Sequence, residues 1–152
     1  MGTPARVSVV SLQEYFPNLQ RTDHDVTSPA SPNYNCLAWA AGVADQWWWP
    51  DPMGVSTWPP SVARAETIKA FIEAFQTLGY VPGADDTVEP QFDKVALYAL
   101  AGVPKHAARQ LSNGRWTSKL GCLEDIEHTL AGISGSWYGD VVEILKRPKT
   151  IP

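Results

Sequence analysis

The sequence predicts an α+β domain in which helices come first and a mostly antiparallel β-sheet follows. Two observations support this prediction. Apolar residues recur at helical spacing within residues 62–78, for example at Ile68, Phe71 and Phe75. From about residue 94 the pattern changes to short apolar segments separated by turn residues, as expected of strands. The 152 residues fit one domain with its own core.

The N-terminal part is predicted to contain an irregular arm followed by a helix. Residues 1–32 are interrupted by prolines, so we expect no regular element there. A helix should begin near Cys36, with Asn33 or Asn35 as its cap, because short polar side chains satisfy the free amides of a first turn. It should run to about residue 44, before the three tryptophans that precede Pro50.

The C-terminal part is predicted to form the sheet. Residues 94–100 are apolar at both odd and even positions, as in a strand covered on both faces. Residues 106–111 and 115–120 flank a Ser-Asn-Gly sequence, which is a hairpin signal. Residues 123–132 are predicted to be a short inserted helix, and residues 140–146 a final strand.

Composition excludes several classes of protein. The 12 basic and 16 acidic residues give a net charge of −4, so we expect neither nucleic acid nor a membrane as partner. No apolar segment approaches the ~20 residues needed to cross a bilayer. The N-terminus lacks the features of a secretory signal. We therefore expect a cytoplasmic protein, or one exported by a route that needs no signal peptide, and no cofactor.

Cys36 is the candidate nucleophile. A cysteine at a helix N-terminus has free backbone amides beside it, which stabilise a thiolate and donate to an oxyanion. The alternative is a small buried apolar residue. A nucleophile needs a base within reach, and His106 at the start of a strand is the candidate. His128 is expected to pair on a helix surface. A metal site of Cys36, His106 and Cys122 lacks the usual ligand spacing.

Four segments together resemble the papain-like cysteine hydrolases, most closely the bacterial cell-wall peptidases and amidases. They are "NYNCLAWAAG", "FDKVALYAL", "HAARQLSNGRWTSKLG" and "YGDVVEILKRP", and the resemblance covers the core from about residue 33 to 146. The resemblance implies a single papain-like domain over residues 1–152. The whole chain also resembles an uncharacterised bacterial domain family with "YNC", "WWWP" and "WTSKLG" blocks, which implies no activity.

The papain-like resemblance assigns roles to individual residues. It makes Cys36 the nucleophile and His106 the base. In the peptidase branch a polar residue about twelve positions after the histidine orients the imidazole. That position is Ser118 here, which accepts a hydrogen bond but adds no negative charge. Asp125, or in second place Glu124, reaching back from the predicted helix, is the alternative orienting residue.

The hairpin register decides whether Ser118 qualifies, and two registers remain open. If Asn113 and Gly114 alone form the turn, Ser118 faces away from His106. If the turn has three residues, from Ser112 to a left-handed Gly114, Ser118 shares the face of His106. The first register would leave the role to Asp125.

An oxyanion hole would combine the Cys36 amide with the side chain of Asn35 or Asn33, although either asparagine is also explained as a helix cap. Trp39, one turn into the helix, is a substrate-binding candidate, with core packing as the alternative. The resemblance thus implies a thiol-dependent hydrolase or acyl-transferase acting on a peptide or peptide-like amide. The competing hypothesis is a catalytically inactive papain-like scaffold that binds a protein partner.

Overall fold

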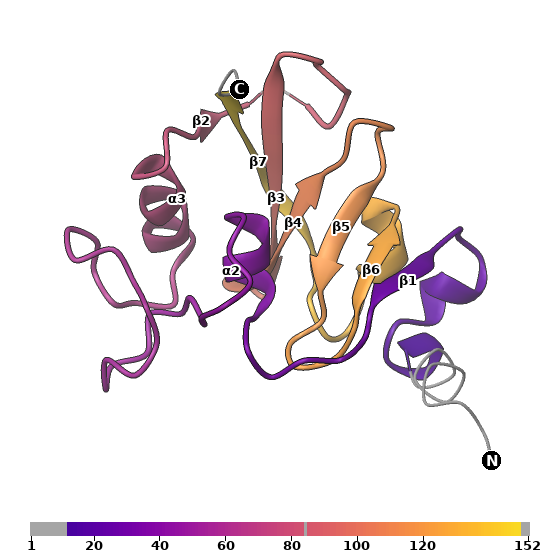
Figure 1. The fold of residues 1–152 in the computed structure, drawn as a ribbon, viewed down its shortest axis with the longest axis horizontal. Helices are drawn as coiled ribbons and strands as arrows, with labels where there is room; N and C mark the ends of the chain where they lie inside the picture. The colour runs from indigo at the N-terminus through magenta and orange to yellow at the C-terminus, as the bar shows by residue number, and fades with distance from the viewer. Residues whose placement is uncertain (1–11, 84, 150–152) are drawn as a thin grey trace.

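A seven-stranded antiparallel sheet forms the centre of the molecule (Figure 1). The computed structural model describes residues 12–83 and 85–149. The strands lie in the order β1-β6-β5-β4-β3-β7-β2. Helices are few and short, so the predicted α+β class with a mostly antiparallel sheet is confirmed. No helix in the described ranges is both long and apolar enough to cross a membrane.

The elements have the following bounds. The strands are β1 (Asp25–Ser28), β2 (Val81–Pro82), β3 (Phe92–Leu100), β4 (Val103–Gln110), β5 (Trp116–Lys119), β6 (Asp125–His128) and β7 (Asp140–Pro148). The helices are α2 (Cys36–Ala40) and α3 (Ile68–Gln76), with the 3-10 helices η1 (Pro17–Gln20) and η2 (Leu130–Ile133).

The sheet is covered on both faces by different parts of the chain. One face packs against α2, α3 and the loop between them, and this core includes Leu37, Phe71 and Leu97. In Figure 1 these two helices lie together on one side of the sheet. The other face packs against residues 12–19 and η2, with Tyr98 and Ile133 in its core. The middle of β3 and the strands β5 and β6 are therefore buried from both sides, whereas β1 and β2 at the ends of the sheet are more exposed.

Helix α3 begins later than its apolar pattern suggested. The Thr67 side chain accepts a hydrogen bond from the Ala70 amide and so caps the first turn. Phe71, fully buried in the middle of the helix, is contacted by the rings of Trp49 and Trp58 at centroid distances of 5.3 and 5.7 Å. Two of the seven tryptophans therefore pack against α3.

Helix α2 is shorter than predicted. It ends at Ala40 rather than near residue 44. Gly42 has a φ of +87°, a left-handed conformation that stops the helix at little cost for glycine.

The prediction of an irregular arm over residues 1–32 is wrong for three of its described segments, the first of which is a helical turn at residues 12–15. Residues 17–20 form η1, which begins at a proline as short helices commonly do. Residues 25–28 form β1, an edge strand that pairs with β6. Sequence patterns missed β1 because its pairing partner lies about one hundred residues away. Residues 1–11 of the predicted arm lie outside the described residues.

The predicted helix at residues 123–132 is also wrong. The segment forms strand β6, which pairs with β5 on one side and β1 on the other, followed by η2. Leu123, Ile126 and Leu130 fit helical spacing, but pairing on both sides satisfies the backbone as strand and overrides that local pattern.

Candidate active site

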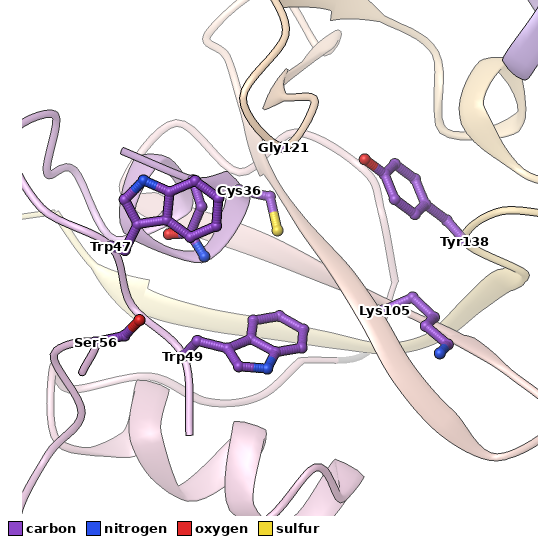
Figure 2. A pocket seen from close by; sticks show the side chains of 8 residues that line it. Cys36, Trp47, Trp49, Ser56, Lys105, Gly121 and Tyr138 are labelled. Carbon is purple, nitrogen blue, oxygen red and sulfur yellow. The ribbon is translucent and has the colours of Figure 1, made fainter. Parts of the chain in front are cut away.

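Cys36 begins helix α2 and lies at the edge of a pocket of about 330 Å³. Its side chain is only 6 % exposed. Figure 2 shows the thiol pointing into a space bordered by the Trp49 ring on one side and by the Tyr138 hydroxyl on the other. The pocket is lined by Asn35, Cys36, Trp47, Trp49, Ser56, Lys105, Gly121 and Tyr138.

Asn35 is the helix cap and also holds the pocket wall. Its Oδ1 accepts hydrogen bonds from the backbone amides of Ala38 (3.3 Å) and Trp48 (3.0 Å). Its Nδ2 donates to the Trp48 carbonyl at 2.8 Å. One buried side chain thus fixes both the start of α2 and the tryptophan loop. Asn33, the other predicted candidate, is exposed and does not line the pocket.

The surroundings of the Cys36 thiol act on its pKa in opposite directions. Burial has the larger effect and raises the pKa to about 11. The backbone amides of Ala107, Leu37 and Cys36 itself, and more weakly the Lys119 ammonium, lower it. The balance leaves the sulfur protonated near neutral pH. The Ala107 contact shows that the thiol lies against the backbone of β4.

His106 on β4 is fully buried and bonded to Ser118. The distance between His106 Nε2 and Ser118 Oγ is 2.8 Å. This contact depends on the hairpin register, in which Arg109 lies opposite Thr117. Gly114 has a φ of +88°, as the three-residue turn requires. The second of the two predicted registers is therefore confirmed, and Ser118 shares the face of His106.

Two aromatic rings enclose the His106 imidazole. The Tyr138 ring is stacked on it, with 4.1 Å between centroids and 10° between planes. The Tyr98 ring meets it edge-on at 5.5 Å. This burial lowers the pKa of His106 well below its usual value, and His128 adds to the shift. The imidazole is therefore neutral at neutral pH.

Cys36 and His106 approach β4 from opposite sides. Cys36 packs in the core on the α2 side, together with Ala107. The ring neighbours of His106, Tyr98 and Tyr138, belong to the core on the other side. The expectation that the ring faces the end of the helix is thus not met in this conformation. Within the described residues His106 Nδ1 is buried without a hydrogen-bond partner.

His128 also belongs to this group, and the prediction that it pairs on a helix surface is wrong. It is fully buried on β6, and its Nε2 lies 2.7 Å from Ser118 Oγ. Its Nδ1 lies 2.7 Å from the Thr129 carbonyl. Ser118 therefore bridges two imidazoles. The alternation of polar and apolar residues in "DIEH" fits a strand as well as a helix, and it was the signal that could have placed His128 on β6.

Asp125 lies on the opposite face of the sheet from His106 and does not orient it. Its carboxylate accepts a hydrogen bond from the Tyr34 hydroxyl at 2.5 Å. Burial raises the pKa of this carboxyl group, and Tyr34 and Lys119 oppose the shift. Lys119 is buried beside it and donates to the Ser31 carbonyl at 2.7 Å. Of the two predicted orienting residues, Ser118 is the one in contact with His106.

Trp39 packs against the core beside α2 and is absent from the described lining of the Cys36 pocket. Its Nε1 donates to Thr117 Oγ1 at 3.0 Å, and the Arg109 guanidinium lies 5.3 Å from its ring centroid. Trp39 thus fastens α2 to β4 and β5. Trp47 and Trp49, two residues of the tryptophan run, line the pocket instead.

The fold and site define an α+β domain with a buried cysteine at a helix start and a histidine–serine–histidine chain in its sheet. The chain belongs to the family described as "Domain of unknown function (DUF7689)", which matches residues 25–146. No curated protein and no solved structure matches it. Within residues 12–83 and 85–149, no three His, Cys, Asp or Glu side chains are grouped to hold a metal ion.

Proposed function

We propose that this domain is a papain-like thiol hydrolase or acyl-transferase that acts on an amide bond of a peptide or peptide-like substrate. The observation that carries the proposal is the state of His106. Its Nε2 is held by Ser118, while its Nδ1 is buried without a partner among the described residues. The next residue along the strand, Ala107, contacts the Cys36 thiol through its backbone.

In the proposed reaction the Cys36 thiol transfers its proton to His106 Nδ1 as the sulfur attacks the substrate carbonyl. The tetrahedral intermediate then collapses. Its C–N bond breaks, and Nδ1 returns the proton to the leaving amine. Water next attacks the thioester and gives a proton to Nδ1. The C–S bond breaks to release the acid, and Nδ1 returns the proton to the Cys36 sulfur. Attack by an amine instead of water gives acyl transfer. Because the two side chains lie on opposite sides of β4 in this conformation, the proposed transfer requires β4 or the segments around it to rearrange when substrate binds, so that sulfur and Nδ1 come within hydrogen-bond distance.

The first turn of α2 would stabilise the oxyanion. The Cys36 backbone amide has no acceptor within the helix and lies beside its own thiol, and the capping Asn35 has one Nδ2 hydrogen beyond the one given to Trp48. Both donors lie at the pocket that holds the thiol. A negative charge formed there would meet preorganised dipoles in a site of low dielectric constant.

Acylation by p-nitrophenyl acetate tests this proposal without knowledge of the natural substrate. We expect a burst of nitrophenolate and an acetyl group on the Cys36 peptide, detected by mass spectrometry. Cys36→Ala should abolish both, and His106→Gln should slow the burst by roughly 100-fold. The matched control is Cys122→Ser, which removes the exposed cysteine and should change nothing. Equal bursts from the Cys36→Ala variant and the natural chain would refute the proposal.

A catalytically inactive scaffold that binds a protein partner is the second candidate. The observations that favour it are the raised pKa of Cys36 and the positions of Cys36 and His106 on opposite sides of β4. This candidate predicts that p-nitrophenyl acetate acetylates Cys36 no faster than a denatured chain under the same conditions. The burst experiment therefore separates the two candidates.

A further inference from the structure

We propose that His128, acting through Ser118, determines which ring nitrogen of His106 carries the proton. His128 is then a positioning residue for the thiol chemistry, and in that role the inference rests on the proposed function. The physical basis is an unbroken line of three hydrogen bonds: Thr129 carbonyl to His128, His128 to Ser118, and Ser118 to His106.

The direction of the line is set at its Thr129 end. A carbonyl oxygen can only accept, so His128 Nδ1 must carry a hydrogen and donate it over the 2.7 Å contact. A neutral imidazole has only one N–H. His128 Nε2 is therefore a bare acceptor.

The same reasoning passes the direction along to His106. Ser118 lies 2.7 Å from the bare His128 Nε2, so its hydroxyl hydrogen points there. Its oxygen is then left with lone pairs toward His106 and accepts from Nε2–H at 2.8 Å. With its one hydrogen on Nε2, neutral His106 has its lone pair on Nδ1. This is the nitrogen without a partner among the described residues.

This direction requires His128 to stay neutral, and its surroundings favour that state. His128 is fully buried, and the nearby Arg115 and His24 both disfavour a positive charge on its ring. The groups facing His106 are Tyr98 from β3, Ser118 from β5, His128 from β6 and Tyr138 from the loop before β7. None of these four is a carboxylate that would draw a proton onto either ring.

His128 fixes the direction of the Ser118 hydrogen bond, which a serine alone would leave open. A hydroxyl can donate or accept, so Ser118 alone would allow the His106 proton on either nitrogen. If His128 could not accept, the Ser118 hydroxyl would be free to donate to His106 Nε2. The proton of His106 would then sit on Nδ1, and the lone pair needed to deprotonate a thiol would be lost.

Nitrogen NMR of the two imidazoles tests the inference directly, because ring nitrogens with and without hydrogen have well-separated shifts. At pH 7 the natural chain should show His106 protonated on Nε2 and His128 on Nδ1. His128→Leu should move His106 to a mixture of forms or to the Nδ1–H form. His128→Gln is the matched variant, because its side-chain carbonyl can still accept from Ser118, and it should retain the Nε2–H form.

The acylation burst provides the functional readout. His128→Leu should slow acetylation of Cys36 by roughly 100-fold, while His128→Gln should stay within about tenfold of the natural chain. A proton found on His106 Nδ1 in the natural chain would overturn the inference, and this measurement needs no variant to fold. Unchanged tautomer and burst in a folded His128→Leu would overturn it equally. Expected NMR spectra without any burst would refute the proposed function and leave the proton order standing.

Discussion

The Tyr138 ring lies flat on the His106 imidazole, with 4.1 Å between the ring centroids. The same tyrosine lines the pocket that holds the Cys36 thiol. One side chain therefore contacts His106 and also borders the pocket of Cys36, although Cys36 and His106 lie on opposite sides of strand β4. Any closure of His106 toward Cys36 must involve this ring.

Substitution of Tyr138 should separate the role of its ring from that of its hydroxyl. Tyr138→Phe keeps the stack and should leave the acetylation burst within about twofold of the natural rate. Tyr138→Leu removes a stack worth about 0.5–1.5 kcal/mol and should slow the burst up to about tenfold. Stopped-flow release of nitrophenolate measures both. An equal loss in the two variants would assign the effect to the hydroxyl instead.

The two cysteines should differ sharply in alkylation. The pKa of Cys36 is raised to about 11 by burial, whereas Cys122 is exposed. Iodoacetamide should therefore label Cys122 first at pH 7, because only a thiolate attacks. Labelling of Cys36, followed in Cys122→Ser, should rise about tenfold per pH unit until near pH 11. A plateau reached below pH 8 would mean that Cys36 already exists as a thiolate paired with a cation.

Stability should fall in mild acid because of the buried histidines. Burial lowers the pKa of His128 to about 4, and that of His106 falls as well. Between the folded value and the ordinary 6.5 the unfolded chain binds more protons, so stability decreases as pH falls from 6.5 toward 4. His128 alone should account for about 3 kcal/mol. Urea unfolding from pH 7 to 4 measures the loss, and His128→Gln should remove the His128 share of it and leave that of His106.

Asn35 and Asn33 form a matched pair for stability. Asn35→Ala removes a helix cap and leaves the Trp48 amide and carbonyl without their side-chain partner, so we expect a loss of about 3 kcal/mol. Asn33 is exposed, and Asn33→Ala should change the free energy of unfolding by less than about 0.5 kcal/mol. Chemical denaturation compares them, and similar losses would contradict the anchoring role of Asn35.

Local signals were sufficient for the features that depend on a few neighbouring residues. A cap before Cys36 and the Ser-Asn-Gly hairpin follow from turn chemistry and strand alternation, whereas the choice of Asn35 over Asn33 and of the register that joins Ser118 to His106 came from the structure. The apolar stripe of α3 also predicted its buried face, although the helix begins only after the Thr67 cap.

The remaining features depend on pairing between distant segments. Strand β6 pairs with β5 and β1. This pairing determines its conformation, although the apolar spacing around Ile126 also fits a helix. His128 could not be assigned to the group around Ser118 until β6 was recognised as a strand. That Cys36 and His106 lie on opposite sides of β4 likewise depends on which face of the sheet α2 packs against. The alternation of residues along one strand does not determine this face.

Strand β1 is a short segment at one end of the sheet, and Arg115 on the neighbouring hairpin bridges its Asp25 to Glu127 of β6. Without residues 25–28, β6 would become the outermost strand and present unpaired amides and carbonyls along the side of the sheet. Such a row is a template on which strands of other molecules add, and this leads to aggregation. A shortened chain that began at the Cys36 helix would thus keep every proposed reactive group and lose its protection against self-association.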